Sequence, residues 1–366
     1  MKRLFIFLVF IFVSFSYTKA RPAVHGVKQD QQLKSQSNGD AEEGVAAKQT
    51  SVERYGYLSV QNGKMVDQHG IQPQLRGISF SWSIWEGEKY YNKEVVDWLV
   101  DDFKVDLIRL SMAIEPKGGY LQNPEEQKKK IITLIDRGIE RGIYVIIDWH
   151  DHNANKNHLE SAAFFQELSK RYQHVPNVIY EIWNEPERQT WSEIKTYSEK
   201  IISAIRTHDK KNLIVVGSPH WDQDVDIAAK EPITVSDNLV YSFHFYASDP
   251  GHQEKLREKA EVALGLGLPL FITEWGVGES NGNGEFNLEK TDRWIDWMEK
   301  HKLSWANWNI TDKEETTALL KPGAPVNGGW NTSNLAPAGN YIRTVLRSFD
   351  KIIKNVHHDG FLKNNN

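Results

Sequence analysis

The chain of 366 residues contains no cysteine. Disulfide bonds therefore cannot stabilise it, and metal sites built from thiolates are excluded. Long runs of lysine or arginine are also missing, and the formal net charge is −5. Nucleic acids and anionic membranes are thus poor candidates as partners, and stability has to come from a large apolar core.

Long apolar runs are missing too, except at the N-terminus, where the run is too short to span a bilayer. Lys2 and Arg3 precede an apolar stretch at residues 4–13, and small residues follow up to Ala20. This pattern is typical of a secretory signal peptide, residues 1–20, that is cleaved after Ala20. We therefore expect a secreted protein, extracellular or, in a Gram-negative source, periplasmic.

Large apolar residues are scarce at 21–50, a segment made mostly of Gln, Lys, Ser, Asn, Gly, Asp and Glu. Such a composition cannot offset the entropy of ordering, so the segment is predicted to be a disordered linker. All 13 tryptophans fall in residues 51–350, which we assign to one globular domain. The final stretch, 351–366, turns polar again and is predicted to be a fraying tail.

Eight short apolar segments recur within this domain and predict β-strands. Their spacing of 28 to 38 residues leaves room for one helix in each gap. Asn123-Pro124 and Gly142 bound one such helix, and Ser161 is expected to cap another. The predicted strands are centred on Arg76, Ile108, Ile146, Ile182, Val215, Phe243, Ile272 and Ala306.

The alternation of strands with helices predicts an α/β fold, a (β/α)8 TIM barrel, which a short hairpin with its turn at Asn62-Gly63 precedes. About 300 residues suit one such barrel. A doubly wound open sheet is the alternative. Its first strand-to-helix turn would carry a glycine fingerprint for dinucleotides, and this chain has none there.

Two predicted strands end in a glutamate, in Asn184-Glu185-Pro186 and in Thr273-Glu274-Trp275-Gly276. In a TIM barrel the carboxyl ends of the strands form the catalytic mouth. Two carboxylates there indicate acid/base and nucleophilic chemistry on one bond. Other polar and aromatic residues gather at the same strand ends, namely Arg109, Trp149, His150, His244, Tyr246 and Trp308.

These strings resemble glycoside hydrolase family 5, in particular its subfamily 2 of endo-β-1,4-glucanases (cellulases). The resemblance runs from Val52 to about Arg347. It rests on eight strings in order: Leu75-Arg76-Gly77, Ile108-Arg109-Leu110, Tyr144-Val145-Ile146-Ile147-Asp148-Trp149-His150, Val178-Ile179-Tyr180-Glu181, Asn184-Glu185-Pro186, His244-Phe245-Tyr246, Thr273-Glu274-Trp275-Gly276 and Ser304-Trp305-Ala306-Asn307-Trp308.

The resemblance implies a retaining double displacement with Glu185 as the acid/base and Glu274 as the nucleophile. In that mechanism the two carboxyl groups stand ~5 to 5.5 Å apart. Glu185 has to be protonated to donate to the leaving oxygen, while Glu274 has to be ionised to attack the anomeric carbon. Their surroundings must therefore separate the two pKa values.

The same likeness implies partners for these two residues. Arg109 and Tyr246 would hold Glu274 ionised, and Asn184 would reach the 2-hydroxyl of the attacked sugar. The peptide bond after Trp308 is implied to be cis. The other implied substrate contacts are His150 and His244 as polar groups, Trp308 as the ring beneath the sugar, Trp85 and Trp221 as stacking platforms, and Lys313 with Glu315 as a polar grip.

The chain departs from part of the subfamily at Ser81 and Ala113, where some members carry histidine and tyrosine. Contacts supplied there are expected to come from Trp82 or His152 instead. At Glu181, a structural role as a solvated charge or a salt-bridge partner is the preferred interpretation. Trp294, Trp297 and Trp305 are expected to pack in the core.

Three alternatives stay open. The same mechanism could act on mannan, lichenan or xyloglucan, or the barrel could bind carbohydrate without catalysis. A metal-dependent hydrolase would use His150-Asp151-His152 as part of a metal site, but no third ligand is obvious. We expect a monomer without cofactor or metal that acts on a β-glucan.

Overall fold

The computed structural model describes residues 49–363, with side chains described as far as residue 350. The predicted signal peptide, 1–20, and nearly all of the predicted linker, 21–50, lie outside the described residues. Within the described part, no helix has both the length and the apolar character needed to cross a membrane.

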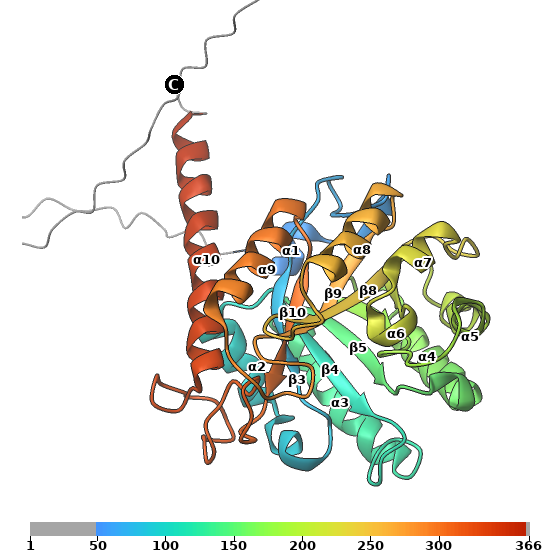
Figure 1. The fold of residues 1–366 in the computed structure, drawn as a ribbon, viewed down its shortest axis with the longest axis horizontal. Coiled ribbons are helices and arrows are strands. Elements are labelled where there is room, and N and C mark those ends of the chain that lie inside the picture. The colour runs from blue at the N-terminus through green and yellow to red at the C-terminus, as the bar shows by residue number, and fades with distance from the viewer. Residues whose placement is uncertain (1–48, 364–366) are drawn as a thin grey trace, which may run out of the picture. The chain divides into compact units, whose positions relative to one another are not determined.

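Eight parallel strands close into a barrel in the order β10-β3-β4-β5-β6-β7-β8-β9 (Figure 1). The (β/α)8 prediction is confirmed, and the open-sheet alternative is wrong. Each strand lies at its predicted position, although β6 ends one residue before Ile182. The strands are β3 (Arg76–Phe80), β4 (Leu107–Ala113), β5 (Tyr144–His150), β6 (Val178–Glu181), β7 (Ile214–Val216), β8 (Leu239–Tyr246), β9 (Leu270–Gly276) and β10 (Trp305–Ile310).

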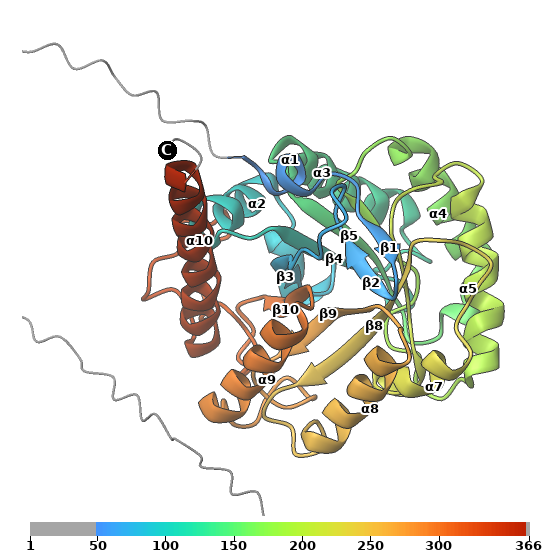
Figure 2. The ribbon, with the colours of Figure 1, turned by 90° about the horizontal axis from the view of Figure 1, so that it is seen from above.

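Helices surround this barrel (Figure 2). They are α2 (Lys93–Trp98) with its continuation η2 (Leu99–Phe103), α3 (Pro124–Glu140), α4 (His158–Tyr172), α5 (Trp191–Arg206), α7 (Val225–Lys230), α8 (Glu254–Gly265), α9 (Leu288–His301) and α10 (Pro337–Lys363). Short turns are η1 (Trp85–Tyr90), η3 (Ala154–Asn157) and α6 (Pro219–Asp222).

Local signals place both ends of α3 correctly. Pro124 occupies the first turn of α3, and Gly142 follows the helix with φ 65°. The predicted cap at Ser161 is wrong, because α4 already begins at His158. Ser161 is buried inside the helix, where its hydroxyl pairs with the Tyr197 hydroxyl at 2.6 Å. Serine favours N-cap positions because its hydroxyl can bond a backbone N–H, but the same hydroxyl can bond a distant side chain, and the sequence does not show which partner it has.

The start of the domain closes the amino-terminal end of the barrel. Helix α1 (Ser51–Tyr55) precedes the hairpin of β1 (Ser59–Gln61) and β2 (Lys64–Val66). The turn residues Asn62 and Gly63 have φ of 51° and 71°, as a type I′ turn requires, so the predicted hairpin is confirmed. Its apolar side chains join the buried residues inside the lower barrel, which include Leu58, Met65, Leu75, Leu107, Tyr144, Ile146, Ile179, Val215, Val240 and Phe271.

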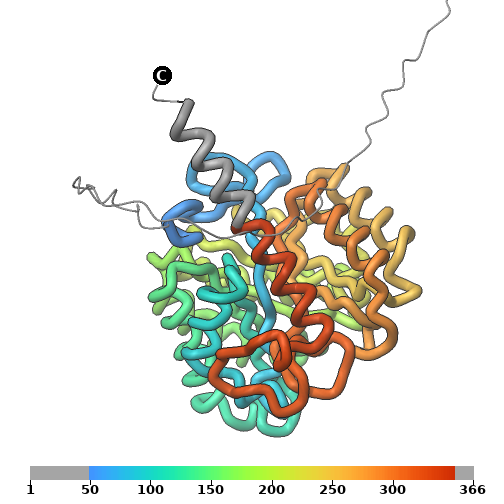
Figure 3. The backbone as a smooth tube through the Cα atoms, turned by 90° about the vertical axis from the view of Figure 1, so that its left-hand side faces the viewer, coloured from blue at the N-terminus to red at the C-terminus, as the bar shows by residue number. Residues whose placement is uncertain are grey.

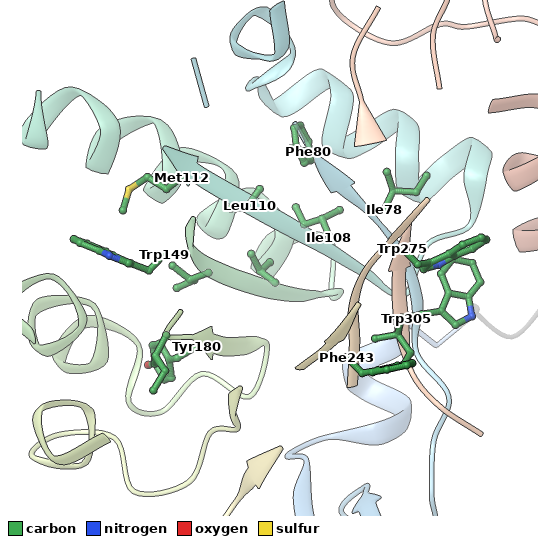
Figure 4. Close-up of a cluster of buried hydrophobic side chains, with 14 of the residues drawn as sticks. Ile78, Phe80, Ile108, Leu110, Met112, Trp149, Tyr180, Phe243, Trp275 and Trp305 are labelled. Atoms are coloured by element: carbon green, nitrogen blue, oxygen red, sulfur yellow. The ribbon is translucent and has the colours of Figure 1, made fainter. Parts of the chain in front are cut away.

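Side chains alternate across each strand, and this alternation divides the core into two parts. On β4, Ile108, Leu110 and Met112 belong to the large apolar cluster shared with the helices (Figure 4). Trp294, Trp297 and Trp305 lie in the same cluster, as predicted. The alternate residues Leu107, Arg109 and Ser111 therefore face the barrel interior, which changes from apolar at its amino-terminal end to polar near its mouth.

Strand β9 carries one extra residue just before the mouth. Its pairing shifts between Phe271 and Glu274 against β8, and between Ile272 and Trp275 against β10. This is a β-bulge, which re-aims side chains locally. As a result Thr273 and Glu274 both make contacts inside the barrel, although they are neighbours in the chain.

Helix α10 runs beside the barrel (Figure 3). Arg343 pairs with Asp102 of η2, and the Tyr341 hydroxyl bonds Asp292 of α9 at 2.5 Å, so α10 bridges the first and last helices of the ring. The helix continues to Lys363, and the fraying predicted for residues 351–366 stays a prediction. Residues 364–366 lie outside the described part.

Candidate active site

Arg109 is the centre of a buried polar layer in the mouth of the barrel. It is fully buried on β4, and its guanidinium reaches carboxylates on three other strands. Nε donates to Glu181 Oε2 at 2.7 Å, Nη1 donates to Glu274 Oε2 at 2.8 Å, and Nη2 lies 2.9 Å from Asp148 Oδ2. The predicted contact with Glu274 is thus present, and Glu181 is a salt-bridge partner as expected.

Glu274 receives a donor on each carboxylate oxygen. Arg109 binds Oε2, and the Tyr246 hydroxyl donates to Oε1 at 2.6 Å. Burial raises the pKa of Tyr246 well above its usual value, with the Glu274 charge adding to the effect, so the phenol stays protonated and remains a donor. The two hydrogen bonds together fix the direction of the Glu274 carboxylate.

Glu185 sits four residues beyond β6 and has the left-handed φ of 53°. Its side chain is 16% exposed, and Oε1 lies 3.0 Å from Nδ1 of His244 on β8. Burial raises the pKa of Glu185, which the charges of His152 and Arg109 partly counteract. Burial also lowers the pKa of His244 to about 4, so the imidazole is neutral at neutral pH.

The distance between the two glutamates is short. Carboxylate oxygens of Glu185 and Glu274, together with a His244 nitrogen, all lie within 4.8 Å of one another. Carboxyl pairs of retaining glycosidases are ~5 to 5.5 Å apart, while inverting pairs need ~6.5 to 9.5 Å to admit a water molecule. The spacing fits the retaining arrangement.

Aromatic and imidazole rings form the wall beside Glu274. His150 and Trp308 stack with ring planes 6° apart, and Trp82 meets His150 edge-on at 4.2 Å. Burial lowers the pKa of His150 well below its usual range, so the ring is neutral. Its Nδ1 lies 2.7 Å from Asp148 Oδ2, which leaves Nε2 on the other side of the ring. The peptide after Trp308 is cis.

Two hollows meet at Glu185 and together form an open cleft. Both are lined by Glu185, Tyr246 and His152. Trp85, 57% exposed, lines the first hollow, and Trp221, 37% exposed, lines the second. The first hollow also contains Trp82, His150, Glu274, Trp308, Lys313 and Glu315, and the second contains His244.

Most of the predicted site residues thus share one cleft. Lys313 and Glu315 form an ion pair of 2.7 Å at its edge. Asn184 is fully buried below the cleft, with Oδ1 accepting from Arg109 at 2.7 Å, and its Nδ2 has no hydrogen-bond partner among the described residues. The roles of these residues toward a substrate stay predictions.

The sequence did not identify several residues that organise the site. Asp148 binds both Arg109 and His150, and Thr273 donates to Glu181 Oε1 at 2.7 Å. A polar residue in an otherwise apolar strand, as Asp148 is, could have been a signal. Asp222 accepts a hydrogen bond from the Glu185 backbone at 2.9 Å, and nothing in its sequence context indicates this contact.

The metal alternative based on His150 and His152 has no support in the geometry. Among the described residues, the group close enough to share an ion is Glu185, His244 and Glu274, and neither His150 nor His152 belongs to it. Both nitrogens of His244 already have partners, Glu185 on one side and the Thr273 hydroxyl on the other.

Comparison with known proteins gives consistent matches. Residues 66–314 match the model of the cellulase family, glycosyl hydrolase family 5. Endoglucanase Z of Dickeya dadantii is 42% identical over 295 residues, which are 80% of this chain and 66% of that protein. An endoglucanase of Clostridium saccharobutylicum is 40% identical over 80% of this chain and 65% of its own length. The chain therefore spans slightly less than two thirds of these relatives.

Solved structures match over the same region. A structure from Cytophaga hutchinsonii is 43% identical with a TM-score of 0.81, covering 84% of this chain and all of that chain. The catalytic domain of Thermobifida fusca endoglucanase Cel5A, in complex with cellotetraose, is 34% identical with a TM-score of 0.77. That match covers 82% of this chain and all of the other.

The Arg109 cluster generates a stability prediction. Arg109→Leu leaves three buried carboxylates without their cation, so we expect the free energy of unfolding to fall by about 3–5 kcal/mol. Arg137→Leu is the matched control, because its partners Asp97 and Glu140 lie on the surface of the helix ring and the loss should stay within about 1 kcal/mol. Urea denaturation at pH 7 measures the free energy of unfolding of both variants. Equal losses would contradict the assignment of Arg109 as the counter-charge of the buried carboxylates.

Proposed function

The chain belongs to glycosyl hydrolase family 5, and on that premise we propose that it is an endo-β-1,4-glucanase acting with retention of configuration. The observation that carries the mechanism is the spacing of Glu185 and Glu274, whose nearest oxygens lie within 4.8 Å. This spacing suits direct attack by one carboxylate and leaves no room for a water molecule between sugar and base, as inversion would need.

Glu274 is the proposed nucleophile. Its two oxygens are held by Arg109 and Tyr246, so the direction of the carboxylate is fixed before substrate arrives. It attacks the anomeric carbon and forms a covalent glycosyl-enzyme. The preorganised hydrogen bonds lower the cost of bringing the reacting atoms into line.

Glu185 is the proposed acid and then base. Its raised pKa keeps the carboxyl protonated to a higher pH than in a free glutamate, as proton donation to the leaving oxygen requires. Thr273 donates its hydrogen to Glu181, so it accepts from His244 Nε2–H, and the unprotonated Nδ1 of neutral His244 then faces Glu185. After the first step, the ionised Glu185 activates the water that releases the sugar.

The substrate class follows from the lining of the cleft. Trp85 and Trp221 on either side of the glutamates offer flat faces for sugar rings, and polar groups between them suit hydroxyls. The unpartnered Nδ2 of Asn184 supports the expected contact with the 2-hydroxyl. The cellotetraose complex of the Thermobifida fusca relative favours a β-1,4-glucan over mannan, lichenan or xyloglucan.

Export and oligomeric state belong to the same proposal. The apolar stretch after Lys2 and Arg3 supports secretion, and a cleft completed by residues of this chain supports a monomer.

The activity is tested on carboxymethyl cellulose by following viscosity and reducing ends together. Cleavage inside the chain lowers viscosity steeply while few reducing ends have formed. A slow fall in viscosity in proportion to reducing ends would contradict the endo mode. Relative activity on mannan, lichenan and xyloglucan, measured in parallel, identifies the preferred polymer. Activity that survives dialysis against EDTA excludes the metal-dependent alternative.

The roles of the two glutamates can be distinguished with substrates that differ in their leaving group. Glu185→Gln is expected to lower kcat/KM on cellotetraose by about 10²- to 10⁴-fold, but to spare a dinitrophenyl cellobioside, whose leaving group needs no proton. Glu274→Gln should abolish turnover of both. Glu140→Gln, on the surface of α3, is the control and should match the unmodified enzyme. Full activity of Glu274→Gln would refute the assignment of Glu274 as the nucleophile, whereas no hydrolysis by the unmodified chain would leave the carbohydrate-binding alternative.

The pH profile follows from the raised pKa of Glu185. An acid catalyst works while protonated, so kcat/KM on cellotetraose should fall as pH rises through the Glu185 pKa, at a value above the ordinary 4.5. The charge of His152 lowers that pKa, so His152→Asn should move the falling limb to higher pH. If the falling part of the pH profile does not move in His152→Asn, a group other than Glu185 causes the fall in kcat/KM.

A further inference from the structure

The backbone at Glu185 requires support from its surroundings. Its φ of 53° lies in the left-handed region, which is sterically unfavourable for a residue with a side chain. Such a conformation persists only when neighbouring groups hold it in place. Two side chains do so here, Asp222 at the backbone N–H and His152 at the backbone carbonyl, at 2.9 and 3.2 Å.

Asp222 is fully buried and uses both carboxylate oxygens on backbone donors. Oδ2 accepts from the N–H of Glu185, and Oδ1 accepts from the N–H of Ser218 at 2.5 Å. Oδ2 also lies 3.7 Å from Nδ1 of His244, the same nitrogen that faces the Glu185 carboxyl. One buried carboxylate thus touches the main chain of Glu185 and approaches the imidazole that contacts its side chain.

The segment that carries Asp222 is itself unusual. His220, Trp221 and Asp222 have φ of 59°, 57° and 57°, three successive left-handed residues. The N–H of Trp221 donates to the carbonyl of Pro186 at 2.9 Å. Two hydrogen bonds in opposite directions, Trp221 to Pro186 and Glu185 to Asp222, therefore join the loop after β7 to the loop after β6.

We propose that Asp222 is a positioning residue that fixes the acid/base Glu185 and couples it to the Trp221 side of the cleft. Trp221 is the exposed ring of that side, and it precedes Asp222 directly in the chain. A sugar that stacks on Trp221 also braces the segment on which Asp222 holds Glu185. This inference rests on the proposed function, in which Glu185 donates the proton.

The chemistry explains why a carboxylate stands at this position. Two N–H groups converge on Asp222 from opposite sides, and only a group with two acceptor oxygens satisfies both. An amide of the same shape would turn its NH2 toward one of these N–H donors and lose that bond. The charged and titratable groups near Glu185 include Asp222, His152, His244, Glu187, Arg109, Glu274 and Tyr246.

The experiment compares Asp222→Asn with the unmodified full chain on two substrates. On cellotetraose, which needs the proton and extends across the cleft, kcat/KM should fall about 10- to 100-fold, part of what a general acid contributes. On dinitrophenyl cellobioside, whose leaving group departs without a proton, kcat/KM should change by less than about threefold. Asp222→Ser keeps a single acceptor oxygen and should give the same ratio of kcat/KM on the two substrates. It replaces Asp222→Asn in the experiment if that variant does not fold.

Asp209→Asn is the matched control. Asp209 is also fully buried and also accepts two backbone N–H groups, those of Lys211 and Asn212 at 3.0 Å, but it lies after α5, outside the cleft. Its substitution should lower the melting temperature without changing the ratio of the two kcat/KM values. A purely structural role of Asp222 would give the same result as Asp209.

A second measurement tests the coupling to Trp221. In a double-mutant cycle of Asp222→Asn with Trp221→Ala on cellotetraose, coupling predicts that the double variant loses less than the product of the two single losses. Independent losses, or equal losses of Asp222→Asn on both substrates, would overturn the inference. Failure of the proposed function is a distinct outcome, since the unmodified enzyme would then hydrolyse neither substrate.

Discussion

The candidate site depends on one buried guanidinium. Arg109 is fully buried, and its donors contact Glu181, Glu274 and Asp148 from three other strands, with the Asn184 side chain as a further acceptor. A buried arginine is stable only when its donors are satisfied, and a buried carboxylate only when it has a counter-charge. Each therefore requires the other, and this mutual requirement ties the carboxyl ends of four strands into one rigid layer.

One positive charge cannot balance three carboxylates, and the structure distributes the excess unequally. Burial raises the pKa of Asp148 to about 7 and also raises that of Glu181, while Glu274 receives the additional Tyr246 donor. Glu185 lies outside this layer, beside a neutral His244, where burial favours its protonated form. Two glutamates of one cleft thus acquire opposite roles from different neighbours, as acid/base pairs require.

Local patterns predicted the strands, the hairpin and the two glutamates, because each depends on a few adjacent residues. The Asn62-Gly63 turn and the strand-ending strings around Glu185 and Glu274 are of this kind. The Ser161 cap was mispredicted, since a tertiary hydrogen bond overrides local preference there. Asp222 was missed because its partner lies 37 positions away in the chain.

Apolar periodicity and turn residues act over short distances, so the order of residues alone specifies eight strands that alternate with helices, with a glutamate near the carboxyl ends of the fourth and the seventh. How those glutamates face each other depends instead on contacts between residues far apart in the chain. The bulge in β9 turns Glu274 inward beside Thr273, and the left-handed backbone of Glu185 is held from the next loop by Asp222. Both depend on barrel closure, which brings distant residues within hydrogen-bonding distance and excludes the water that would otherwise satisfy them.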